Sequence, residues 1–270
     1  MIIELLNGTR LDVADYNLKR LYHYIPSANI EHNSVAIDGR SDIILNSKIN
    51  NRTISVDFVY LSQDIFDFYL LRDEVNSLFL REESYYIIFK NEPHKRWLVK
   101  AANGYNLQPN QRLESFTIEF IALNLYAESV ATTQSLKEWD IDVWAWNGSI
   151  NWDEDLQYTF NSNNFTVKNL GNAIINPRQS PLRIIVVGTF DDTVNIRNTT
   201  TGDFYSFTHG VNINNGNRLV LDGIRTVFDE ISFFRRTNKK LITLAPGDNV
   251  FEVTGGQVES ISFDFRFLYK

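Results

Sequence analysis

The amino-acid sequence predicts a mostly β protein with two domains. A chain of 270 residues has room for two hydrophobic cores of ordinary size. Short segments that alternate apolar and polar residues, separated by Asn, Gly, Asp or Pro, recur along its length, which is the pattern of strands and turns. Helical periodicity occurs in one place, at about residues 63–80. We place the two domains at residues 1–130 and 131–270.

The first clear element is a strand at residues 51–61, in which Ile54, Val56 and Phe58 alternate with polar residues. The helix follows directly. Ser62 is the expected N-cap, and Asp64 falls in the first helical turn. The apolar residues of one helical face are Phe68, Leu71, Val75, Leu78 and Phe79. Their spacing predicts a helix of about four turns that covers a sheet.

Three more strands are expected in this half, at residues 84–90, 96–100 and 115–123. Upstream, residues 30–51 form two polar arms around a turn at Asp38 and Gly39, which predicts a hairpin. Such a hairpin buries little by itself, so we expect it to pack on a neighbour. Residues 129–142 have no clear period and are predicted to be a linker or a loose crossover.

The second half consists of short strands with turns at regular spacing and no helical period, which predicts a two-sheet sandwich. The stretch Pro246-Gly247-Asp248-Asn249 is predicted to be a corner of this scaffold, with no ligand. About nine strands are expected, at residues 165–169, 182–188, 194–198, 203–207, 217–223, 230–235, 240–244, 250–253 and 260–267.

Composition excludes several classes of protein. There is no cysteine, so disulfides and thiolate metal sites are absent. The net charge of −7 is spread evenly over the two halves, which argues against a protein that grips nucleic-acid phosphates. The four histidines show no metal-ligand spacing, and no cofactor motif occurs. The first residues lack the pattern of a signal peptide, and no apolar run spans a membrane, which predicts folding in a cytoplasm.

Two local patterns offer a binding site. Four of the five tryptophans lie in residues 139–152, and Trp144, Trp146 and Trp152 form a possible platform for sugar rings. The alternative is that these rings fill the junction between the domains. The run Phe233–Lys240 holds four basic residues, which indicates either contact with an anionic partner or a solvated hairpin tip.

An enzyme is not predicted. The acidic pairs Asp153 with Asp155 and Asp191 with Asp192 are the only candidates for a glycosidase, and adjacent or alternate acids on extended chain do not fix a carboxylate separation. No Gly-x-Ser-x-Gly elbow occurs. This profile indicates a structural or binding protein.

The order of elements resembles the distal tail proteins of phages with long, non-contractile tails. In the first half, the resemblance lies in NRTISVDFVYL, the helix with LLRDEVNSLF, YYIIF, EPHKRWLVKA and SFTIEFIALNLYAES. In the second half, it lies in FTVKNLGNAIINPRQSPLRIIVVG, VNIRNTTTGDFYSF, NRLVLDG and LITLAPGDNVFEV. It covers nearly the whole chain.

This resemblance implies an N-terminal β-sandwich with one helix and an extended hairpin, followed by a galectin-like β-sandwich of the jelly-roll type. It implies a structural virion protein that forms a homo-hexameric hub at the tail tip, assembled in the host cytoplasm. The expected partners are the tail-tube protein, the tail-tip protein and a receptor-binding protein, and DNA would pass through the ring without specific binding. The hairpin, including Arg40, Ser41 and Asp42, would reach the neighbouring subunit. The alternative function is a carbohydrate-binding module for the host cell wall.

Overall fold

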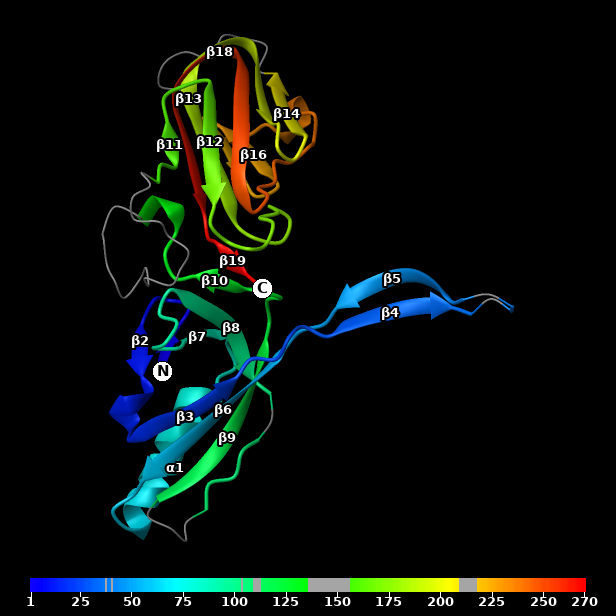
Figure 1. Cartoon of the computed structure of the whole chain (residues 1–270). Helices are drawn as coiled ribbons and strands as arrows, with labels where there is room; N and C mark the ends of the chain where they lie inside the picture. The colour runs from blue at the N-terminus through cyan, green and yellow to red at the C-terminus, as the bar shows by residue number, and fades with distance from the viewer. Residues whose placement is uncertain (37, 40, 103, 109–112, 136–155, 209–217) are drawn as a thin grey trace. The chain divides into compact units, whose positions relative to one another are not determined.

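The computed structural model describes the chain except residues 37, 40, 103, 109–112, 136–155 and 209–217, and it divides into two compact units. Unit 1 comprises Met1–Ala127, and unit 2 comprises Glu128–Lys270. Both units are built from antiparallel strands, and one α-helix occurs in the described residues (Figure 1). The prediction of a mostly β fold is confirmed.

Unit 1 is built on an antiparallel sheet with the strand order β2-β1-β7-β8-β9-β6-β3. Its longest pairing is that of β6 with β9, which stay in register over nine residue pairs from Thr53 with Ile121 to Leu61 with Leu113. A short 3-10 helix, Val13–Tyr16, joins β2 to β3. The strands are β1 Ile2–Glu4, β2 Arg10–Asp12, β3 Leu18–Tyr24, β6 Thr53–Leu61, β7 Tyr85–Ile88, β8 Lys95–Ala101 and β9 Leu113–Ala122.

Helix α1 (Ile65–Phe79) covers this sheet through aromatic contacts (Figure 1). The Phe79 ring lies 5.3 Å from that of Phe58 on β6 and 5.9 Å from that of Phe120 on β9, between ring centroids. The five side chains that α1 buries are the predicted ones: Phe68, Leu71, Val75, Leu78 and Phe79. The helical period therefore identified the buried face correctly.

The predicted cap was wrong. Asp64, not Ser62, occupies the N-cap, where its Oδ1 accepts hydrogen bonds from Phe66 N (2.8 Å) and Asp67 N (2.9 Å). Ser62 is buried two residues earlier. Both residue types are good caps, and the carboxylate also interacts favourably with the helix N-terminus, so the sequence alone did not discriminate between them.

We expect Asp64→Ala to lower the free energy of unfolding of unit 1 by about 1 kcal/mol, because two backbone donors lose their acceptor. The control is Asp73→Ala, which removes an exposed carboxylate paired with Arg72 and is expected to change stability by less than about 0.5 kcal/mol. Urea unfolding of both variants measures the difference. Equal effects of the two changes would refute the capping role.

Unit 2 has the strand order β11-β18-β13-β15-β16-β17, with β12 also paired to β18 and β14 also paired to β13. The long strands change partners along their length: β13 pairs β15 near Leu182 and β14 near Asn198. The strands of this sheet are β11 Thr159–Phe160, β12 Asn164–Asn169, β13 Leu182–Asn198, β14 Asp203–Thr208, β15 Leu219–Asp222, β16 Arg225–Phe228, β17 Ile231–Ser232 and β18 Gly247–Phe265. Two short strands outside it, β10 Ala127–Ser129 and β19 Leu268–Tyr269, pair with each other.

Several predicted strands of unit 2 were wrong in extent. Residues 182–188 and 194–198 belong to one strand, β13, and residues 250–253 and 260–267 fall largely in one strand, β18. The strands continue where the sequence indicated breaks, because irregular pairing absorbs the interruptions at Val187/Gly188 and between Phe190 and Asn195. Gly255 has φ +100°, and a Cβ there would lie 1.9 Å from Thr193 O, so only glycine lets β18 approach β13.

Two further predictions need correction. Within 230–235 only Ile231 and Ser232 are strand, and within 240–244 only Leu244 makes a β-bridge, to Ile175. The described part of the predicted linker is packed rather than loose. Thr133 is buried, and its Oγ1 donates to Phe263 O (2.8 Å) and accepts from Phe265 N (3.1 Å).

Candidate assembly surfaces

A two-stranded arm projects from unit 1 between β3 and β6 (Figure 1). It consists of β4 (Ile30–Val35) and β5 (Ile43–Ile49), which pair only with each other. The predicted turn is present at Asp38 and Gly39, where Gly39 has φ +75°. Every residue of both strands is exposed. The hairpin is therefore formed as predicted, and nothing in the described part of the chain covers it.

Polar side chains hold the middle of the arm together. Asn33 Nδ2 donates to Asn46 Oδ1 (2.7 Å), and His32 Nδ1 and Ser47 Oγ are hydrogen-bonded at 2.7 Å. Glu31 lies opposite Lys48 in the same register. Such cross-strand pairs contribute a few tenths of a kcal/mol each, up to about 1. They fix the register without providing a core.

The ends of the arm are apolar, which corrects the prediction of a polar hairpin. Ile30 pairs with Ile49 at the base, and Val35 pairs with Ile43 near the tip. Leu45 is the extra residue of a bulge in β5 and is 67% exposed. An isolated hairpin is only marginally stable, and the exposed apolar side chains make the arm a candidate surface for contact with another chain. The six exposed apolar residues are Ile30, Val35, Ile43, Ile44, Leu45 and Ile49.

A second apolar surface lies on the outer side of α1. Phe66 and Leu70, one helical turn apart, are 77% and 67% exposed, and Ile65 and Tyr69 lie beside them. The first two turns of the helix are therefore apolar on the outer side as well as on the side that faces the sheet. A helix that is apolar all round is normally covered on both sides. The arm and this helix face are the candidate assembly surfaces of unit 1.

Two of the three predicted interface residues are described by the structure. Ser41 and Asp42 are exposed and directly precede β5. Arg40 lies outside the described residues. Their role in an interface stays a prediction. The prediction of interface residues did not include the apolar side chains beside them, although Ile43-Ile44-Leu45 is an apolar run in the sequence.

The predicted sugar platform, Trp144, Trp146 and Trp152, lies outside the described residues, as do Asp153 and Asp155. Asp191 and Asp192 are adjacent and exposed on β13. Among the described residues no group of three His, Cys, Asp or Glu side chains is placed to hold a metal ion. In the same part of the chain, no helix is long and apolar enough to cross a membrane.

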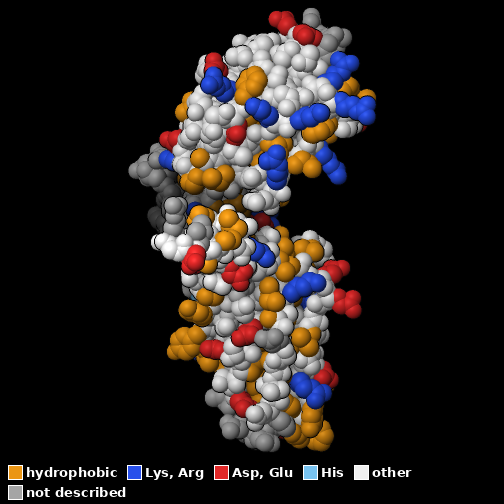
Figure 2. All heavy atoms as spheres, turned by 90° about the vertical axis from the view of Figure 1, so that its right-hand side faces the viewer, with side chains coloured by type: hydrophobic (Ala, Val, Ile, Leu, Met, Phe, Trp, Pro, Cys, Tyr) orange, Lys and Arg blue, Asp and Glu red, His pale blue; other side chains and the backbone are white. Residues whose placement is uncertain are grey.

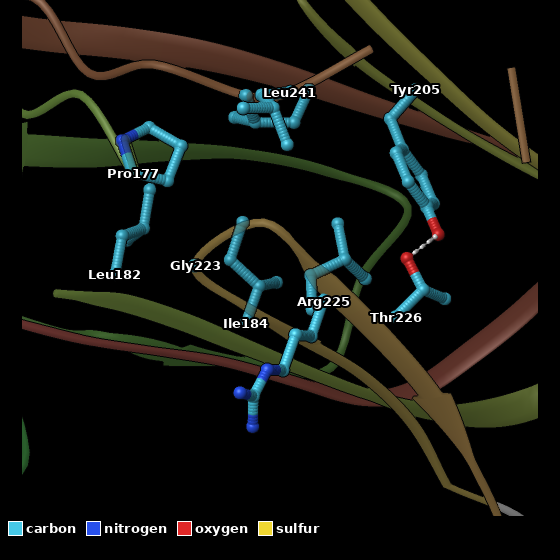
Figure 3. Close-up of a pocket in the computed structure, with 10 residues that line it drawn as sticks. Pro177, Leu182, Ile184, Tyr205, Gly223, Arg225, Thr226 and Leu241 are labelled. Carbon is cyan, nitrogen blue, oxygen red and sulfur yellow. Dashed lines mark hydrogen bonds between the residues drawn. The ribbon is translucent and has the colours of Figure 1, made fainter. Parts of the chain in front are cut away.

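One small pocket of unit 2 lies between the β15–β16 turn and the segment that precedes β18 (Figure 3). Apolar side chains such as Leu182, Ile184 and Leu241 line most of it. At its end, the hydroxyls of Tyr205 and Thr226 are hydrogen-bonded at 2.9 Å, and burial raises the pKa of Tyr205 to about 12. The space is about 10 Å³, which is room for one water molecule and not for a sugar ring.

Comparison with known proteins agrees with this architecture. Residues 7–122 match the family model described as phage tail protein RIFT-related domain. Among curated proteins, no sequence relative is found. The crystal structure of the Dit protein (gp 19.1) of phage SPP1 is similar, with a TM-score of 0.71 and 17% identity, and the match covers 99% of each chain.

Structures of the phage p2 baseplate in its activated conformation, with Ca or with Sr, match at a TM-score of 0.44 and 12% identity, over 98% of this chain and 96% of the other. The family model and the SPP1 structure together confirm the predicted resemblance to distal tail proteins. The family model covers most of unit 1, and the SPP1 match extends the similarity of fold to the whole chain.

Proposed function

We propose that this chain, which carries a phage tail protein domain in unit 1 and has the fold of a Dit protein throughout, is the structural hub at the distal end of a phage tail. The observation that carries the proposal is the match over 99% of both chains to SPP1 Dit, which is described as a paradigm of hub adsorption apparatus in phages that infect Gram-positive bacteria. The proposed role is to join the tail tube to the tip proteins that attach to the host, including a receptor-binding protein.

We further propose that six copies form a closed ring. A ring built by rotation requires a heterologous contact, in which one surface of a subunit meets a different surface of the next. The arm of unit 1 suits this requirement, because it extends away from its own sheet (Figure 1). It also exposes apolar side chains at its base and near its tip. The exposed face of α1 gives unit 1 a second apolar surface for the same assembly.

DNA would pass through such a ring without specific binding. The net charge of −7 supports this role, because a protein of the same sign as the phosphate backbone does not retain it. We place the protein in the virion, at the tail tip, after assembly in the host cytoplasm. No catalytic role is proposed.

Light scattering across a concentration series, followed by negative-stain imaging, tests the ring. We expect a species of six 31.3-kDa chains, about 188 kDa, with a central hole. A mass that stays at 31.3 kDa at all concentrations would contradict self-assembly. Immunogold labelling of virions separately tests the location, and label anywhere but the tail tip would refute the hub role.

A further inference from the structure

A basic segment of unit 2, Phe233–Lys240, is docked onto the edge of strand β14. The Phe233 ring lies 6.3 Å from that of Phe207 and 6.1 Å from that of Phe228, between centroids. Asn238 donates twice, from N to Ser206 O (3.0 Å) and from Nδ2 to Phe204 O (2.8 Å). Residues 234–236 form a 3-10 helix. The segment is therefore a fixed part of the surface and not a free hairpin tip.

This surface presents aromatic, aliphatic and basic side chains together. Phe204, Ile231 and Phe234 are among the exposed large hydrophobic residues, and Ile231 is 62% exposed. Arg235, Lys239 and Lys240 are exposed beside them and have no ion-pair partner in the described part of the chain. Figure 2 shows basic and hydrophobic side chains interleaved on this unit. We call these six residues the basic-aromatic patch.

The backbone around the patch is held in an unfavourable conformation. Asp229 (φ +43°), Glu230 (φ +66°) and Lys239 (φ +59°) are three of the four non-glycine residues with positive φ in the described part of the chain. Asp229 and Glu230 form the two-residue turn that places Ile231 on β17, where Asn-Gly would be the easier sequence. Left-handed backbone at residues other than glycine concentrates at functional surfaces.

We propose that the basic-aromatic patch docks an acidic protein surface that inserts apolar side chains between the basic ones. Phenylalanine and arginine, both exposed in the patch, are residue types enriched in protein interfaces. A simple polyanion such as a phosphate polymer would use the three cations and leave Phe204, Ile231 and Phe234 in water. The whole chain is acidic, so the patch is opposite in sign to its own protein and complementary to an acidic partner.

The test uses the full chain and an array of 15-residue peptides in which the number of acidic residues and the number of apolar residues vary independently. We expect binding only by peptides that contain both kinds. Arg235→Glu with Lys239→Glu, and separately Phe234→Ser, should each weaken this binding at least tenfold. All three side chains are exposed, so the fold is expected to remain intact, which circular dichroism checks. The control is Arg178→Glu with Lys270→Glu, exposed basic residues of the same unit outside the patch, and should change nothing.

Three results would overturn the proposal. Binding of inorganic polyphosphate as tight as that of the best peptide, with no effect of Phe234→Ser, would show a general polyanion site. Equal weakening by the control variant would show that only net charge matters. If none of the peptides bound, the proposed docking function would be refuted. The ring is measured by mass, so its failure and the failure of this proposal are distinguishable.

Discussion

Replacing Asn249 by alanine is expected to lower the free energy of unfolding of unit 2 by about 3 kcal/mol or more, because several buried backbone groups lose their partners. Asn249 is fully buried at the corner formed by Pro246 and Gly247. Its Oδ1 accepts from Ala245 N (2.8 Å), and its Nδ2 donates to Ala245 O (2.8 Å) and to Gly247 O (3.1 Å). The Asn249 side chain is thus hydrogen-bonded to backbone groups on both sides of Pro246.

The hydrogen-bond network of Asn249 includes a second buried asparagine, Asn198. Asn198 Nδ2 donates to Asn249 Oδ1 (3.1 Å) and to Thr243 O (2.8 Å). The other end of the Asn198 amide, Oδ1, accepts from Thr200 N (3.1 Å) at the turn between β13 and β14. The two side chains therefore link the end of β13 to the start of β18. A buried network of this kind destabilises strongly when one member is removed, because the remaining polar groups stay buried.

Calorimetry of the full chain measures the effect. We expect the transition of unit 2 to move down by about 10 °C in Asn249→Ala, while the transition of unit 1 stays in place. The matched control is Asn176→Ala, which removes a single surface hydrogen bond from Arg178 N and should cost about 1 kcal/mol or less. Equal shifts in the two variants would show that the buried network does not hold the corner.

At this corner, the turn could be predicted from the sequence, whereas the role of Asn249 could not. Pro246 and Gly247 predict a turn by their backbone preferences alone, and Gly247 has φ +83° in the structure. The turn was therefore correctly expected. The role of Asn249 depends on carbonyl groups of β12 and of the preceding loop, which only the tertiary fold brings together. An asparagine after a turn appears in the sequence as one more turn residue.

Other parts of the chain show the same difference between features that local sequence predicts and features that depend on the tertiary fold. The buried face of α1 followed from local periodicity, and the arm followed from two short segments around Asp38 and Gly39. The continuous strands β13 and β18 did not, because glycine in a strand looks like an end unless a partner strand is known to approach closely there. The exposed face of α1 was also missed. Its apolar residues interrupt the polar face, and the helical period makes only the buried face evident.

Among the candidate site residues, only their place on the chain could be predicted. Ser41 and Asp42 were expected on the arm, and they lie there. Nothing in a single chain determines which arm side chains contact another copy, because the contact involves a surface of another molecule. The exposed fractions of the arm side chains favour other residues as candidates for the proposed interface. Ile44 and Leu45, exposed and apolar, are better candidates for the interface than the polar residues before them.

Changing Ile44 and Leu45 together to aspartate is therefore expected to abolish the proposed ring. Each side chain would contribute about 1.5–3 kcal/mol if fully buried at an interface, and a buried unpaired carboxylate adds a further cost. Both are exposed in the monomer, so the fold should persist. Light scattering should show 31.3-kDa monomers in place of the ring. The control is Ile174→Asp with Ile224→Asp, equally apolar and about equally exposed on unit 2, which should leave the ring intact.

Mixing the arm variant with the unchanged protein tests the kind of contact. In a heterologous interface the variant loses its arm tip but keeps the surface that receives an arm. It can therefore accept the arm of a normal copy and then leave the next contact unmade. An excess of variant should convert rings into short open oligomers. If the arms instead paired with each other across a two-fold axis, the variant would be excluded and the normal copies would associate as before. Unchanged rings in the mixture would thus contradict a contact between an arm and a different surface.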